Sequence, residues 1–405
     1  METEAAPVTR EFYPQIARYN GQKSFQKALA AGIITADDVA LVREFVQERQ
    51  AQKHISDGRV NKIIFTLVQW RRFIPRQYRD VAIGEIYAAI SELKTGQNAH
   101  KKVFQQNTIH DYIRILKPFL LWMIENGYSS LPEKKLRAIA APAVNYQTTK
   151  PDEILSLEEI ELLIRASVNT RDRALIGCLY ESGARIGEIC RLTWRDVIFD
   201  KYGVKLYIDD QKTRKRRYSR LTMSREYLAA WKNDFHPGEP LPDARVFATF
   251  EGRPLDYTQA VRILRRLVTR SGIKKKVHPH LFRKSRITHM IAQNYQESVI
   301  KESLWGNANT GMFRTYVCLA ERDIDAEFLD RAGIKVKADE ERPLVARPCP
   351  ECHTVNSPTA RFCPTCGFSF TEEGTSAMNV MRNLMSNPDD LIAYAEWRKK
   401  QKNQS

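Results

Sequence analysis

Apolar residues recur every three to four positions through much of the first third of the chain, and this spacing predicts a series of amphipathic helices. The helices are expected at residues 25–32, 34–52, 59–74, 81–93 and 108–127. Thr35 precedes acidic residues and is the expected N-cap of the second helix, while Asn126-Gly127 is a typical helix-ending pair. We therefore expect residues 1–145 to form a compact helical domain.

The helical spacing stops between residues 141 and 155, where two prolines and several polar side chains indicate an interdomain linker. Ser156 and Glu159 then form a capping-box pattern that begins a new helix. Residues 204–209 and 216–223 alternate in polarity and contain β-branched and aromatic side chains, so they are expected to be strands. Helical patterns lie on both sides of them. Residues 150–335 should thus form a second domain, mainly α with a small antiparallel sheet.

Two Cys-x-x-Cys pairs separated by ten residues predict a metal site near the end of the chain, formed by Cys349, Cys352, Cys363 and Cys366. Four thiolates at this spacing can surround one Zn²⁺ ion tetrahedrally, and they leave no coordination position for a substrate, so the ion is expected to be structural. The unit, residues 343–370, resembles a zinc ribbon, and residues 375–405 are expected to form a C-terminal helical tail.

The composition narrows the class of partner. Lysine and arginine total 64 against 48 acidic residues, which gives a formal net charge of +16. Such a surplus points to a polyanion such as nucleic acid, although an ordinary basic protein would also fit. The chain has no apolar run of about 18 residues and its first residues have no apolar signal core, so we expect a cytoplasmic protein without a membrane span.

Four segments of the second domain carry side chains suited to chemistry at a phosphodiester. Their main residues, in chain order, are Arg185, Lys212, His280, Arg283, Asn307 and Tyr316. A phosphoryl transition state needs cations and donors around its non-bridging oxygens, and the planar fork of arginine matches that geometry. It also needs a nucleophile in line and an acid for the leaving oxygen.

In their order and spacing these segments resemble the tyrosine recombinase, or phage integrase, family over about residues 150–320. The resemblance implies that Arg185 and Arg283 bind the scissile phosphate and that Glu188 orients Arg185. It also implies that His280 donates to the phosphate and serves as acid or base. Tyr316 would be the nucleophile. A small ribbon after the catalytic domain is similar to those of archaeal-type integrases.

Lys212 has the family's position for the acid that protonates the 5′ oxygen. A lysine can do this only if neighbouring cations lower its pKa, and the four basic residues at 214–217 would supply that field. Two alternatives stay open at this point. The run can simply be a patch that binds DNA phosphates, and Lys215 competes with Lys212 for the acid role.

Asn307 departs from the family pattern, which has histidine or tryptophan nine residues before the tyrosine. An asparagine amide donates a hydrogen bond to a phosphate oxygen but carries no charge. This departure leaves the contribution of Asn307 to activity open.

The resemblance implies a reaction through a 3′-phosphotyrosyl intermediate on double-stranded DNA, without a cofactor for the chemistry and with four identical subunits on two DNA sites. The helical first domain would be the core-binding domain of the family. Its candidate phosphate contacts are Lys53, Arg59, Lys62, Arg71, Arg72, Lys101, Lys102 and Arg114. Two rival functions fit the same sequence: a tyrosine-type topoisomerase, and a zinc-ribbon DNA-binding regulator with a degenerate recombinase core.

Overall fold

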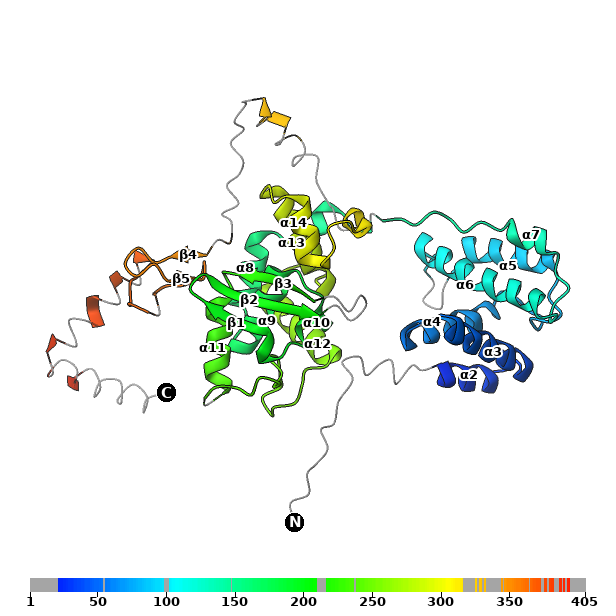
Figure 1. Ribbon diagram of the computed structural model, residues 1–405, viewed down its shortest axis with the longest axis horizontal. Helices are drawn as coiled ribbons and strands as arrows, with labels where there is room; N and C mark the ends of the chain where they lie inside the picture. Colours follow the sequence, from blue (N-terminus) through cyan, green and yellow to red (C-terminus); the bar gives the residue numbers. More distant parts are fainter. Residues whose placement is uncertain are drawn as a thin grey trace, which may run out of the picture. The chain divides into compact units, whose positions relative to one another are not determined.

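The computed structural model describes residues 21–315 except 54, 98–101, 147, 210–215 and 237. It also describes residues 344–372 except 345 and 364, together with scattered positions in 325–332 and 375–393. The chain divides into two compact units, Met1–Thr148 and Thr149–Ser405. Each unit is described below by itself (Figure 1).

The first unit is helical throughout its described part. Its helices are α2 (Gly21–Ala30), α3 (Ala36–Gln52), α4 (Asp57–Trp70), α5 (Ile83–Thr95), α6 (Gln106–Glu125) and α7 (Glu133–Arg137). Thr35 caps α3 in a capping box with Asp38, and Asn126 ends α6 before Gly127 at φ 72°, so both predicted boundaries are confirmed. Trp70 and Phe119 are fully buried in a core shared by these helices, which explains the three-to-four-residue spacing of the apolar positions.

A buried carboxylate connects three parts of this unit. Asp38, which is inaccessible to solvent, accepts a hydrogen bond from the Tyr78 backbone N–H at 2.9 Å and pairs with Arg71 Nε at 3.1 Å. Arg71 also donates to the Ile74 carbonyl at 2.6 Å, and its side chain is only 6% exposed. The sequence placed Arg71 among the phosphate-binding candidates. That expectation is wrong, because the guanidinium is nearly buried and is paired with Asp38 and the Ile74 carbonyl.

The second unit combines a helical bundle with a three-stranded antiparallel sheet (Figure 1). The sheet has the order β1 (Val197–Asp200), β2 (Gly203–Asp209) and β3 (Arg216–Leu221), with Leu206 opposite Ser219. The longer helices are α8 (Leu157–Arg165), α9 (Thr170–Ser182), α11 (Arg225–Phe235), α12 (Tyr257–Ser271), α13 (Pro279–Ala292) and α14 (Glu297–Trp305). The short elements are α10 (Ile186–Ile189), η1 (Pro151–Glu153), η2 (Trp194–Asp196) and η3 (Gly311–Thr315).

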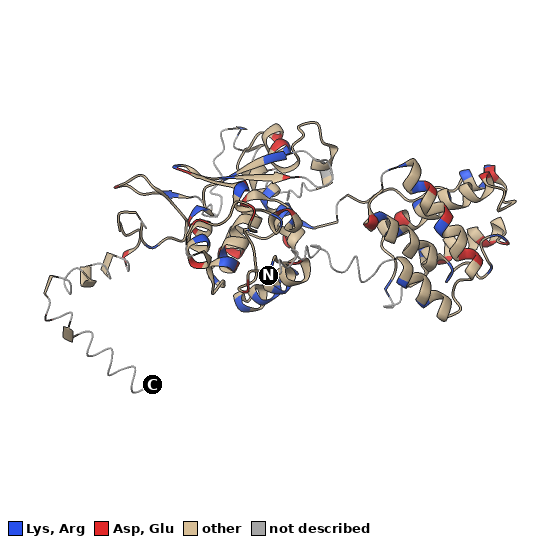
Figure 2. Ribbon diagram, turned by 60° about the horizontal axis from the view of Figure 1, so that its bottom comes forward, with Lys and Arg blue, Asp and Glu red and all other residues tan. Residues whose placement is uncertain are grey.

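The predicted class, mainly α with a small antiparallel sheet, is confirmed. The Ser156–Glu159 capping box at the start of α8 is also present. The sequence missed β1, because Val197–Asp200 is too short to show an alternating pattern. Lysines and arginines occur on both units, interspersed with acidic residues, so neither unit alone carries the basic surplus (Figure 2).

The ribbon near the end of the chain contains β4 (Arg347–Pro348) and β5 (Val355–Asn356), paired antiparallel. A hydrogen bond of 2.7 Å joins the hydroxyl of Thr359, in the ribbon, to the hydroxyl of Tyr227, on α11. The ribbon therefore contacts this helix of the second unit. Most of the expected tail at 375–405 lies outside the described residues. Among the helices that the structure describes, none combines the length and the apolar character needed to cross a bilayer.

The Asp38 cluster predicts a large stability effect from one substitution. Asp38→Ala leaves the buried Arg71 guanidinium without its carboxylate, which should cost about 3–5 kcal/mol in the free energy of unfolding of the first unit. Asp37→Ala is the matched control, because it removes only a half-exposed pair with Arg79 and should cost less than about 1 kcal/mol. Urea unfolding of the full chain measures both, and equal losses would contradict the assignment.

Candidate functional site: a cluster of cations around two helix ends

Arg185 is positioned by the sharp turn that ends α9. Gly183 adopts φ 58°, and a Cβ at this position would lie 2.6 Å from Leu304 Cδ2, so only glycine fits both the conformation and the space. Arg185 then begins α10, and its side chain is 30% exposed. Glu188, one turn later, accepts hydrogen bonds from the Arg185 backbone N–H at 2.8 Å and from Nη1 at 2.7 Å. Glu188 therefore fixes both the backbone and the guanidinium of Arg185.

Arg283, in the first turns of α13, is completely buried. Its Nη1 donates to the Gly183 carbonyl at 2.7 Å, and its Nη2 donates to the Leu304 carbonyl at 2.9 Å. The guanidinium also lies over the Trp305 ring, 4.7 Å from the centroid. One side chain thus ties the turn before Arg185 to the last turn of α14.

His280 lies one helical turn before Arg283 on α13. The surrounding protein desolvates its imidazole, and the charges of Arg283 and Arg185 repel a proton there, so the pKa of His280 lies below its ordinary value. His278 and Lys284 act in the same direction. In the protein without a ligand the ring is therefore neutral at pH 7 and has both a donor and an acceptor nitrogen. Because Arg283 binds the carbonyl two residues before Arg185 and His280 precedes Arg283 by one turn of α13, the three residues lie in one part of the fold.

Asn307 follows the end of α14, where Gly306 adopts φ 61°. Its side chain is exposed, and its Oδ1 accepts a hydrogen bond from the Asn309 backbone N–H at 3.0 Å. Because the oxygen is used within the turn, the amide nitrogen is the end available for donation to a ligand. Asn307 therefore lies just past the helix end that Arg283 holds.

Lys212 and Tyr316, the expected acid and nucleophile, both lie outside the described residues. The segment that contains Lys212 connects Asp209 of β2 to Arg216 of β3. Tyr316 comes directly after η3, nine residues beyond Asn307. The structure thus describes β2, β3 and η3, which adjoin the two residues in the sequence. The roles of Lys212 as acid and Tyr316 as nucleophile stay predictions.

Arg217 differs from what the sequence suggested. It was expected among the basic residues whose charge surrounds Lys212, but its side chain points into the fold and is only 2% exposed. It pairs with Glu188 at 2.8 Å, so its charge is compensated there. Trp305 was also missed, since nothing in its sequence surroundings indicates that its ring lies beneath a buried arginine.

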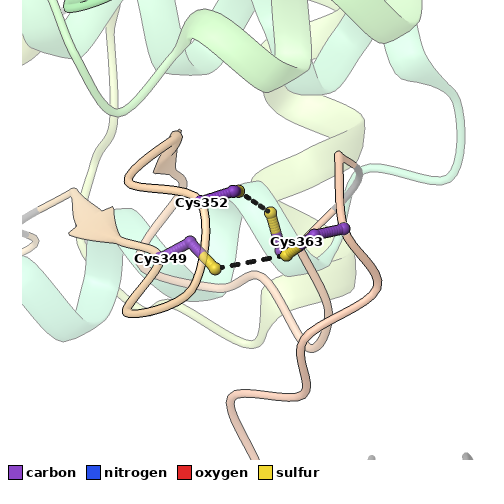
Figure 3. Close-up of side chains that lie close together, drawn as sticks. Cys349, Cys352 and Cys363 are labelled. Carbon is purple, nitrogen blue, oxygen red and sulfur yellow. Dashed lines mark hydrogen bonds between the residues drawn. The ribbon is translucent and has the colours of Figure 1, made fainter.

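The four cysteines of the ribbon form a separate cluster. Their sulfur atoms all lie within 4.8 Å of one another, and Figure 3 shows three of the side chains converging from two loops. The loops are built alike: His353 N–H donates to the Cys349 carbonyl at 2.9 Å, and Gly367 N–H donates to the Cys363 carbonyl at 2.8 Å. Both His353 and Gly367 have positive φ. Four convergent thiols with this spacing fit a tetrahedral zinc site.

Comparison with known proteins assigns both sites to known kinds of domain. Residues 153–322 match the phage integrase family, and residues 349–370 match the zinc-ribbon domain. The tyrosine recombinase XerC of Xanthomonas axonopodis pv. citri is 28% identical over 222 residues, which are 54% of this chain and 70% of that protein.

Two solved structures of lambda integrase have the same fold. A dimer bound to a COC′ core site has a TM-score of 0.54 at 17% identity and covers 68% of this chain and 76% of its own. A tetramer bound to a Holliday junction has a TM-score of 0.53 at 17% identity and covers 69% and 77%.

The helical domain with its three-stranded sheet is thus similar in fold to lambda integrase. Residues 153–322 thus carry a domain that matches the phage integrase family, and a zinc-ribbon domain follows that region.

Proposed function

We propose that this protein is a site-specific DNA recombinase that cleaves and rejoins DNA through a covalent bond between Tyr316 and the 3′ phosphate. The main observation behind the proposal is that the Arg283 side chain donates hydrogen bonds to two segments of the chain at once. It binds the Gly183 carbonyl, two residues before Arg185, and the Leu304 carbonyl, three residues before Asn307. Side chains from three distant parts of the chain therefore surround one small region.

The region suits a phosphodiester. The Arg185 side chain is 30% exposed, and His280 lies in the field of Arg185 and Arg283. A bound phosphate would satisfy these cations, and it would raise the pKa of His280 back toward its ordinary value because a negative charge favours imidazolium. We assign Arg185 to the non-bridging oxygens, His280 to proton transfer and hydrogen bonding, and Asn307 to a neutral hydrogen bond. We also assign Arg283 to a non-bridging oxygen, and this requires its guanidinium, which is buried with both Nη atoms on backbone carbonyls, to become accessible when DNA binds.

The chemistry we propose is transesterification. The Tyr316 oxygen attacks phosphorus while His280 accepts the phenol proton, the bond to the 5′ oxygen breaks, and Lys212 gives that oxygen a proton. A phenol has a pKa of about 10, so the surrounding cations must stabilise phenolate as it forms. The 5′ hydroxyl of a partner strand then displaces the tyrosine. Each step exchanges one phosphoester for another, so no cofactor takes part in the chemistry.

The remaining parts of the chain have proposed roles around this centre. The first unit is the core-binding domain, which grips duplex DNA through its exposed basic residues and works with residues 150–335 as the catalytic domain. Strand exchange between two duplexes would involve four copies of the chain. The lambda integrase tetramer on a Holliday junction supports this stoichiometry by analogy only. We place the reaction in the cytoplasm.

The ribbon is proposed to hold one structural Zn²⁺ ion through Cys349, Cys352, Cys363 and Cys366. All four protein ligands come from the chain, so the ion has no open position for a substrate and contributes to folding instead. Its binding energy would hold together a segment whose two strands are only two residues long each.

The nucleophile is tested by covalent capture on DNA. The protein is incubated with fragments of the genome that encodes it, adducts that survive detergent are sequenced, and the recovered site is rebuilt as a nicked duplex that traps the intermediate. The wild-type chain should form an adduct and release a 5′ hydroxyl, and Tyr316→Phe should form none.

Tyr295→Phe serves as the matched control, since Tyr295 is 44% exposed on another loop and should leave the adduct unchanged. An adduct that persists in Tyr316→Phe would refute the assignment. A protein that binds specific DNA but never forms an adduct would favour the regulator instead. Relaxation of a supercoiled plasmid that lacks the recovered site would favour a topoisomerase.

The zinc assignment predicts about one Zn²⁺ per chain in protein purified without chelators, measured by elemental analysis. Cys363→Ser should lose most of this zinc on dialysis against a competing chelator, because only three thiolates would be left to hold it. Cys190→Ala, which changes a cysteine buried in the second unit, should retain it. Zinc-free wild-type protein, or full retention in Cys363→Ser, would contradict the assignment.

A further inference from the structure

Arg217, on β3, has no role in the proposed chemistry, but it lies between α10 and the end of α14. On β3 the side chains alternate, so Arg217, Ser219 and Leu221 point inward while Arg216 and Tyr218 are exposed. An arginine on the inward face of a strand is costly to bury and needs charged or polar partners there. The partners of Arg217 come from two of the segments that form the cation cluster.

The first partner is Glu188. Arg217 Nη2 donates to Glu188 Oε2 at 2.8 Å, and the same oxygen accepts the Arg185 backbone N–H at 2.8 Å. The other carboxylate oxygen accepts Arg185 Nη1 at 2.7 Å. One carboxylate, 5% exposed, is thus shared between the buried side chain of Arg217 and the partly exposed side chain of Arg185.

The second partner is the end of α14. Arg217 Nε donates to the Ser303 carbonyl at 3.0 Å, and a Cβ added to Gly306 would lie 3.4 Å from Arg217 Cβ. The last carbonyls of a helix have no partner within the helix and carry its negative dipole end, so a cation stabilises them. Arg217 holds the Ser303 carbonyl as Arg283 holds the Leu304 carbonyl, and Asn307 and then Tyr316 follow from this turn.

The charges explain why a second arginine is needed. A lone Glu188–Arg185 pair would be neutral and would weaken the attraction of Arg185 for a phosphate. Two guanidiniums around one carboxylate leave a net charge of +1 on the trio. Burial raises the pKa of Glu188, but Arg217 and Arg185 more than offset this, so its pKa lies below the ordinary value and the carboxylate stays ionised.

We propose that Arg217 is a positioning residue for strand cleavage: it fixes Glu188, and through it Arg185, while it anchors the helix end that leads to Asn307 and Tyr316. It touches neither DNA nor the reacting atoms. This inference rests on the proposed recombinase function, and it adds a residue that the reaction needs without direct contact.

Arg217→Lys is the most informative variant. Lysine keeps the buried charge, so the fold should survive, but a single ammonium lacks the planar fork that reaches Glu188 and the Ser303 carbonyl together. At saturating protein, single-turnover cleavage of the captured DNA site should slow by about tenfold to a hundredfold, because a small misplacement of a catalytic group has effects of this size. DNA affinity should stay within about twofold of the wild type, since phosphate contacts elsewhere supply most of it.

A second substrate separates positioning from general damage to the fold. In a methylphosphonate at the scissile position, a methyl group replaces one non-bridging oxygen and removes the negative charge that Arg185 would neutralise. The ratio of wild-type to Arg217→Lys cleavage rates should then fall toward one, and Arg185→Ala should show the same pattern. A merely structural defect would slow cleavage of both substrates by the same factor, which would overturn the proposal.

Arg220→Lys is the matched control, because Arg220 lies on the same strand and pairs with Asp200 at 2.7 Å, away from Glu188. It should cleave both substrates at the wild-type rate. If thermal unfolding shows that Arg217→Lys does not fold, we use the double variant Arg217→Met/Glu188→Gln, which leaves no unpaired buried charge. It should also cleave the natural site slowly and show a rate ratio closer to one on the methylphosphonate. Full-rate cleavage by the folded variant overturns this inference alone, whereas a wild-type chain that never cleaves overturns the proposed function.

Discussion

One buried carboxylate sets the geometry of the second unit's candidate site. Glu188 binds Arg185 through both its backbone and its side chain, and it binds Arg217 from β3. Without Glu188, the guanidiniums of Arg185 and Arg217 would lose the carboxylate between them, and the turn after α9 would lose the group that caps α10. Arg283 completes the arrangement by joining that turn to the end of α14. The whole cluster is thus a set of like charges kept close by one acid and a few helix-end carbonyls.

Much of this architecture could be predicted from local signals. The capping residues Thr35 and Ser156 and the helix-ending Gly127 act through their immediate neighbours, so sequence spacing is enough to locate them. The same holds for the cysteine pairs, whose geometry follows from two short loops. His280 and Arg283 lie on α13, and their three-residue separation in the sequence matches one turn of that helix.

The errors concern residues whose environment is set by distant parts of the chain. Arg71 and Arg217 each belong to a basic stretch, and a basic stretch usually faces solvent. Arg71 is buried against Asp38, 33 residues earlier in the sequence, and Arg217 against Glu188, 29 residues earlier. Only the tertiary fold reveals such pairings. They also show that some arginines of a basic stretch are structural, so position in such a stretch does not by itself make a side chain available to a ligand.

The central claim is that Arg185, His280 and Arg283 act on a single phosphate. A crystal structure of Tyr316→Phe bound to its intact DNA site tests this most directly, since the DNA cannot be cleaved. The account predicts that both guanidiniums and the imidazole lie within hydrogen-bond distance of the non-bridging oxygens of one phosphate, with residue 316 facing its phosphorus. Contacts from these three side chains to different phosphates, or to none, would contradict it.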